Sequence, residues 1–125
     1  MDKNPVPTGD ETIHDLLEEF RSGAKLKHFG DFLENEEVTL AGFAQFKNAL
    51  RKLEAKSPAG RDVLIPLLND PDSSVRAIAC AHLITRHTDL VMPILDELIQ
   101  EWGTEAASSA RNTKMLFDSG LYDGR

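Results

Sequence analysis

The stretch VLIPLLNDPDSSVRAIACAHLITRH, residues 63–87, decides the fold. Its middle reads NDPDSS, from Asn69 to Ser74. Proline has no N–H to donate, and Asn, Asp and Ser favour turns and helix N-caps, so this segment predicts a break between two helices. The first helix is expected to end near Asn69. The second is expected to run from about Ser74 to His87, with its cap between Pro71 and Ser74.

The second of these helices is apolar on nearly every side. A helix of this kind is normally surrounded by other elements. It is also too short to cross a bilayer, which takes about 20 residues. We therefore place it at the centre of a small helical domain. Its apolar residues are Val75, Ala77, Ile78, Ala79, Cys80, Ala81, Leu83 and Ile84.

The N-terminal part of the chain predicts one long amphipathic helix. Asp10 or Thr12 can cap its start, apolar residues follow at helical spacing, and Gly30 is expected to end it. After Gly30, residues 32–33 (Phe-Leu) are expected to return to the core. An acidic loop at 34–37 is expected to follow.

Four further helices are expected around the central one, at residues 39–56, 58–69, 90–102 and 104–118. Thr39 can cap the first of them, whose apolar stripe is expected to hold Phe43, Phe46, Leu50 and Leu53. The pair Ser57-Pro58 resembles an N-cap followed by proline at the first helical position. No strand-like alternation of useful length is present, so the sequence predicts an all-α fold of about five to six helices.

The length of 125 residues suits a single core, and we expect one helical domain over residues 10–120. Residues 1–9 contain two prolines and one glycine and are expected to form a flexible tail, and residues 121–125 a second one. Two segments, 65–68 and 92–95, echo each other, and each begins a helical pair. Stacked pairs of this sort are typical of α-solenoids.

The central stretch resembles a HEAT repeat, through the pattern Leu67-Leu68-x-Asp70-x4-Val75-Arg76-x2-Ala79-x3-Leu83. The wider chain is similar to a family of small bacterial helical proteins, family two thousand and nineteen of the domain-of-unknown-function series. The resemblance implies a short HEAT-like α-α superhelix in which Asp70 braces the inter-helix turn and Arg76 ties adjacent turns together. It implies no activity, but related small helical proteins occur as immunity partners of bacterial toxins.

The charge of the chain is −7 and lies mostly at the N-terminal end. Residues 1–40 hold ten acidic and four basic residues, whereas residues 41–60 hold one acidic and four basic residues. Such a balance disfavours general binding to nucleic acid or to anionic membranes and suits a basic protein partner. The candidate contact residues are Asp15, Glu18, Glu19, Glu34, Glu36 and Glu37, with Trp102 as a possible interface anchor.

A basic stripe of Lys47, Arg51, Lys52 and Lys56 runs along the second expected helix. Basic residues at these spacings are usually a solvated helix face, and we favour that interpretation. The alternative is a nucleic-acid-binding patch.

No motif for catalysis, phosphate binding or a cofactor is present in the sequence. His82 is expected to be a packed core residue with one hydrogen bond. His82 and His87 are five residues apart, which is not the spacing that lets two histidines of one helix hold a metal, so we expect no metal site. The single cysteine excludes an internal disulfide. The N-terminal stretch has no apolar run, so we expect no signal peptide; we also expect no membrane-spanning segment and a location in the cytoplasm.

These observations favour a non-enzymatic protein-binding module. The most concrete form of this hypothesis is an immunity protein that neutralises a bacterial toxin by direct binding through an acidic helical face. Two alternatives stay open: a nucleic-acid-binding HEAT-like module and a homo-oligomeric structural protein.

Overall fold

The computed structural model describes residues 11–121. The expected tail at 1–9, the alternative cap Asp10 and residues 122–125 of the second expected tail lie outside them. The described part is all-helical, which confirms the all-α prediction. Its six helices are α1 (Ile13–Leu33), α2 (Glu36–Lys56), the 3-10 helix η2 (Gly60–Asn69), α3 (Ser73–Leu83), α4 (Thr88–Ile99) and α5 (Glu105–Asp118).

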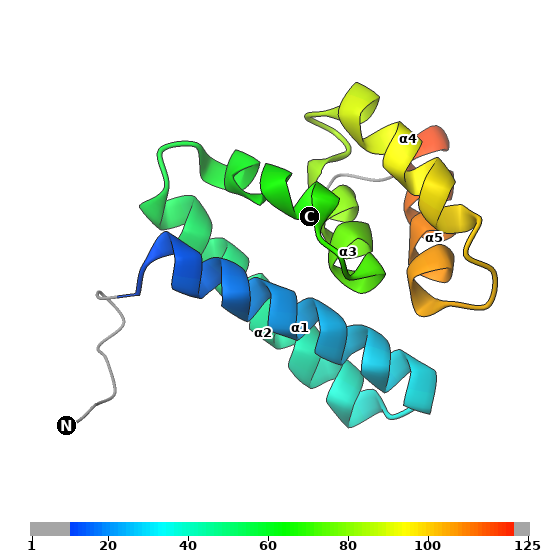
Figure 1. Cartoon of the computed structure of the whole chain (residues 1–125), viewed down its shortest axis with the longest axis horizontal. Helices are drawn as coiled ribbons and strands as arrows, with labels where there is room; N and C mark the ends of the chain where they lie inside the picture. The colour runs from blue at the N-terminus through cyan, green and yellow to red at the C-terminus, as the bar shows by residue number, and fades with distance from the viewer. Residues whose placement is uncertain (1–10, 122–125) are drawn as a thin grey trace.

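Helices α1 and α2 form a long antiparallel hairpin on one side of the molecule, and η2, α3, α4 and α5 lie on the other side (Figure 1). As its apolar composition predicts, α3 lies at the centre, where it contacts η2, α1, α4 and α5. Its buried residues include Val75, Ile78, Cys80 and Leu83. The same core takes in α1 through Phe20, together with side chains from every other helix.

Glycines let the backbones of α1 and α2 approach each other closely. A Cβ atom added to Gly30 would collide with the backbone of Thr39, and one added to Gly42 would collide with the backbone of Lys27. The prediction that Gly30 ends the first helix is therefore wrong. Gly30 lies inside α1, at the point where α1 and α2 cross. The prediction failed because a glycine at a close crossing and a glycine at a helix end give the same local signal.

The turn between α1 and α2 is shorter than predicted. Helix α1 continues to Leu33, and α2 begins at Glu36 with Asn35, not Thr39, as its N-cap. The expected acidic loop is therefore reduced to residues 34–35. Phe32 is 71% exposed and Leu33 is 48% exposed, so their predicted return to the core is wrong.

The apolar stripe of α2 is confirmed in part. Phe46, Leu50 and Leu53 are buried, whereas Phe43 is 46% exposed and lies edge-on against Phe46. Ser57 caps the end of α2 and does not open the next helix. That next helix has 3-10 geometry and contains Pro66, which has no N–H and would disturb an α-helical ladder.

The C-terminal boundaries differ from the predicted ones by a few residues. Helix α3 ends at Leu83 instead of His87, and α4 ends at Ile99 instead of Trp102. Helix α5 has Thr104 as its N-cap and ends at Asp118, as predicted. A wide turn between α4 and α5, with Gly103 at φ +80, brings the start of α5 toward the end of α1.

Candidate protein-binding surface

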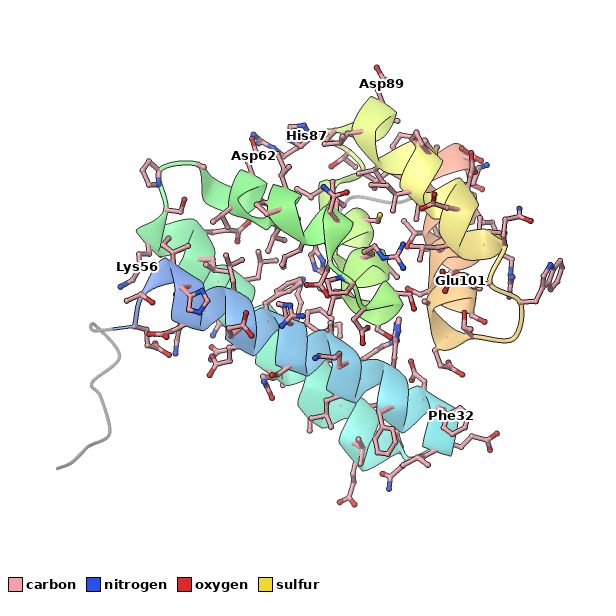
Figure 2. All side chains as sticks on the ribbon, viewed as in Figure 1. Phe32, Lys56, Asp62, His87, Asp89 and Glu101 are labelled. Atoms are coloured by element: carbon pink, nitrogen blue, oxygen red, sulfur yellow. The ribbon has the colours of Figure 1, made fainter. Side chains whose placement is uncertain are left out.

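The six acidic candidate residues do not form one face. Asp15, Glu18 and Glu19 lie in the first two turns of α1, which we call the base. Glu34, Glu36 and Glu37 lie where α1 and α2 meet, which we call the tip. At 1.5 Å per residue, α1 separates the two groups by about 25 Å. In Figure 2, Phe32 marks the tip of the hairpin and Lys56 its opposite end.

The base acids support the fold locally. Asp15 forms a capping box with Thr12, whose backbone N–H hydrogen bond is the main reason that the pKa of Asp15 lies below its usual value. Glu18 pairs with Arg21 at 3.0 Å. Glu19 is half-buried, and its backbone carbonyl accepts a hydrogen bond from Gln45. Two of these three carboxylates therefore already have partners within the chain.

The tip acids are exposed, as Asp15 and Glu18 are, but they differ from them in their partners. None of the three carboxylates contacts a basic side chain of residues 11–121. Glu34 ends α1 in the left-handed conformation, with φ 55, and is the one non-glycine residue of the described chain with positive φ. A glutamate at such a position is strained relative to glycine. The tip thus presents negative charge that the fold does not neutralise.

An open hollow of about 360 Å³ lies beside the tip, between the end of α1 and the N-termini of α3 and α5. Phe29, Phe32 and Gly103 contribute apolar surface to it, and Asp72 and Glu105 contribute acidic groups. A neighbouring hollow shares Glu105 and is lined by Glu34 and Glu36 among others. Figure 2 shows Phe32 on the same side of the molecule as Glu101, which lies in the turn after α4. The tip acids therefore adjoin an apolar depression.

Trp102, the candidate anchor, lies in the turn just before Gly103 and is 81% exposed. The guanidinium of Arg111 lies 5.7 Å from the centre of its ring. Trp102 therefore lies next to a residue that lines the hollow, and its role as an anchor stays a prediction.

Asp70 braces the turn before α3. Its carboxylate accepts a hydrogen bond from the Asp72 N–H at 3.0 Å and pairs with Arg21 of α1 at 2.6 Å. Burial alone would raise the pKa of Asp70, but the hydrogen bonds from Arg21 and Asp72 outweigh it and lower the pKa. Asp70 therefore ties the turn to α1, a contact that spans 49 residues and that no local pattern indicates.

Arg76 connects α3 with α4. Its guanidinium lies 3.8 Å from Glu97 and 3.7 Å from Glu101, while its Nε is buried without a hydrogen-bond partner. Its position joins two neighbouring helices of the C-terminal half, so we assign it a structural role.

His82 is buried, as its place on the apolar helix predicts. Its Nδ1–H donates to the Ile78 carbonyl at 2.8 Å, and its Nε2 faces the Lys47 ammonium at 3.3 Å. Phe20 and Phe46 pack edge-on against the ring. Burial lowers the pKa of His82 to about 4, so the ring is neutral at pH 7 and can accept a hydrogen bond from Lys47 at Nε2.

Two histidine contacts were missed by sequence reasoning. His28 of α1 is buried, hydrogen-bonded through Nδ1 to Ser74 Oγ at 2.8 Å, and burial lowers its pKa to about 4. His87 pairs with Asp62 at 2.9 Å (Figure 2), and Arg86 donates to the same carboxylate. The hydrogen bond from His87 is the main reason that the pKa of Asp62 is lowered. Both contacts join residues more than 20 positions apart, beyond the reach of helical spacing.

The basic stripe on α2 is partly engaged within the chain. Lys52 pairs with Glu11 at 3.1 Å, Arg51 donates to Asn48, and Lys47 contacts His82 and the ring of Phe43. The nucleic-acid-binding alternative has no support in these contacts and stays a prediction.

Over residues 11–121, no group of three His, Cys, Asp or Glu side chains could hold a metal ion, and no helix is long and apolar enough to cross a membrane.

Comparison of the chain with family models, with curated proteins and with solved structures gives no match. The HEAT-like resemblance, and the superhelix that it implies, therefore stay predictions.

Proposed function

We propose that this protein is a non-enzymatic protein-binding module that recognises a basic surface of another protein through the tip. The observation that carries the proposal is the contrast between the two acidic groups. Asp15 and Glu18 at the base have partners within the chain. The three tip acids contact no basic side chain of residues 11–121, and Glu34 and Glu36 line a hollow that adjoins the apolar depression. Exposed acids of one sign favour fast encounter with a basic partner and penalise an acidic one.

The narrower form of the proposal is an immunity protein that neutralises a bacterial toxin, for instance a nuclease. A nuclease binds a phosphate backbone through basic residues, so a cluster of carboxylates is complementary to its active face. The support for this form is the acidic tip and the family resemblance of the sequence. A secreted protein with a basic C-terminal toxin domain, encoded by the neighbouring gene, would give the partner to test.

The experiment that tests the proposal uses the full chain as bait in a lysate of its host. Each recovered protein is identified, purified and titrated at two salt concentrations. We expect a basic partner whose dissociation constant increases with salt, and whose binding weakens at least tenfold when Glu34, Glu36 and Glu37 are all changed to Gln.

A matched control changes three acids away from the tip, Glu18, Asp89 and Asp118, to their amides, which alters the net charge equally. This variant should retain binding to within about threefold, because salt screens charges that lie far from the tip. Glu18 lies at the base, Asp89 lies at the opposite end of the molecule from Phe32 (Figure 2), and Asp118 ends α5, about 20 Å along that helix from Glu105. Recovery of no basic partner, or equal weakening by the two triple variants, would contradict the proposal.

A further inference from the structure

The hollow beside the tip combines two features that a partner must match. It is lined largely by apolar surface, and its rim carries more acids than bases. We propose that it receives one large apolar side chain of the partner, from a segment in which lysine or arginine residues flank that side chain. This inference rests on the proposed function and adds where and how the partner docks.

Two exposed aromatic rings line the hollow. Phe29 is 55% exposed and Phe32 is 71% exposed, and both line the hollow. Large apolar side chains that remain exposed in one place mark interaction surfaces more often than isolated ones do. Gly103, which has no side chain, lines the hollow at the turn before α5.

The charges around the hollow favour a basic partner segment. Asp72 and Glu105 line the hollow together with a single base, Lys25. The adjoining hollow adds Glu34 and Glu36. Four of these five charges are negative. A segment with basic residues on both sides of an apolar anchor would meet opposite charge along the rim, whereas an acidic segment would be repelled.

Two other occupants fit the hollow less well. The N-termini of α3 and α5 both border it, but the Asp72 carboxylate already accepts from Ser74 N–H and the Thr104 hydroxyl from Ala107 N–H. An anion would therefore meet capped helix ends and nearby carboxylates. A second copy of the chain that presented the same face would bring its own acidic rim against this one.

The test uses three synthetic helical peptides of equal length, titrated into the isotopically labelled full chain and followed by NMR. The first carries lysines around one exposed phenylalanine, the second has alanine in place of that phenylalanine, and the third has glutamate in place of lysine. We expect the first to bind with shifts centred on Phe29, Phe32 and Gly103. The second should bind about tenfold more weakly, and the third should not bind.

Matched variants of the protein locate the anchor. Phe32→Ser should weaken the first peptide about tenfold, whereas Leu90→Ser, at an exposed position on α4, should leave binding unchanged. Both side chains are exposed, so neither change should unfold the protein. Sedimentation of the unliganded chain should show a monomer. A dimer that Phe32→Ser dissociates would overturn the inference in favour of a second copy.

The outcomes separate this inference from the proposed function. If the phenylalanine and alanine peptides bind equally, if the shifts centre on the base, or if no peptide binds, the docking inference is wrong. The proposed function would still stand if a basic host protein binds in a way that needs the tip acids. If that host partner binds but Phe32→Ser leaves its affinity unchanged, only the docking inference fails.

Discussion

The base and the tip of the α1–α2 hairpin hold three candidate acids each but use them differently. At the base, Asp15 closes a capping box and Glu18 pairs with Arg21, which in turn holds Asp70. At the tip, Glu34 occupies a strained left-handed position and its neighbours Glu36 and Glu37 remain exposed. Acidic composition alone therefore does not identify a binding surface. What distinguishes the two ends is whether the fold itself supplies partners for the carboxylates.

The largest expected effect is a loss of stability in acid that involves both ends of α1. His28 lies toward the tip, His82 packs on Phe20 toward the base, and burial lowers the pKa of each from 6.5 to about 4. Between these values the unfolded chain binds more protons, so the free energy of unfolding falls as the pH drops from 6.5 toward 4. We expect a loss of about 3 kcal/mol per histidine, measured by urea unfolding at stepped pH.

The variant His28→Gln should remove about half of this pH dependence. Equal free energies of unfolding at pH 7 and pH 5 would show that neither buried histidine resists protonation.

The second prediction concerns the crossing of α1 and α2 near the tip. Gly30→Ala places a methyl group against the backbone of Thr39, and this steric clash can be relieved only if the two helices move apart. We expect a loss of about 3 kcal/mol in the free energy of unfolding, because overpacking against backbone is poorly relieved. Thermal unfolding followed by circular dichroism measures it.

A suitable control is Ala44→Ser, at an exposed position of α2, with an expected change below about 0.5 kcal/mol. If the Gly30→Ala protein is as stable as the wild type, α1 and α2 must lie further apart near the tip than they do in this structure.

The third prediction tests the structural use of charge at the base. Asp70→Asn removes the charge that Arg21 faces at 2.6 Å in a largely buried position. We expect the free energy of unfolding to fall by about 2 kcal/mol, because the guanidinium then lacks its main partner. Glu18→Gln removes the exposed partner of the same arginine and should cost less than about 0.5 kcal/mol. Equal effects of the two changes in urea unfolding would refute the distinction between them.

The smallest expected effect has the opposite sign. Glu34→Gly relieves the left-handed conformation at the end of α1 and should stabilise the protein by about 1 kcal/mol. Glu37→Gly, in the first turn of α2, should destabilise it by about the same amount, because glycine disfavours the helix and the change removes an acid that interacts favourably with the helix N-terminus. Chemical unfolding of both variants checks the signs. A stabilised Glu34→Gly protein that binds its basic partner less well would show that the strained glutamate serves binding.

Much of the fold could be predicted from local signals. The apolar run of α3 indicated its central position, and Thr12, Thr104 and the segment before Ser74 gave correct helix starts. These signals are local because a cap acts within one turn of its own helix. Gly30 shows the limit: its role depends on where Thr39 lies in space, which no spacing within α1 reveals.

The candidate site was predicted less completely. Its acids were identified from charge density, but the sequence could not indicate that Arg21 and Thr12 would engage those at the base. The exposure of Phe32 was missed because an apolar residue near a helix end is normally assigned to the core. Which apolar side chains remain outside a core depends on how much room the other helices leave, and that is decided by tertiary packing.

The position of Trp102 has a practical consequence. It is the only tryptophan of the chain, it is 81% exposed, and it stands in the turn beside the hollow. Its fluorescence should change little when the core melts, since its surroundings are already aqueous. Emission and acrylamide quenching would instead report whether something covers that turn, so one intrinsic probe can follow occupancy while circular dichroism follows unfolding.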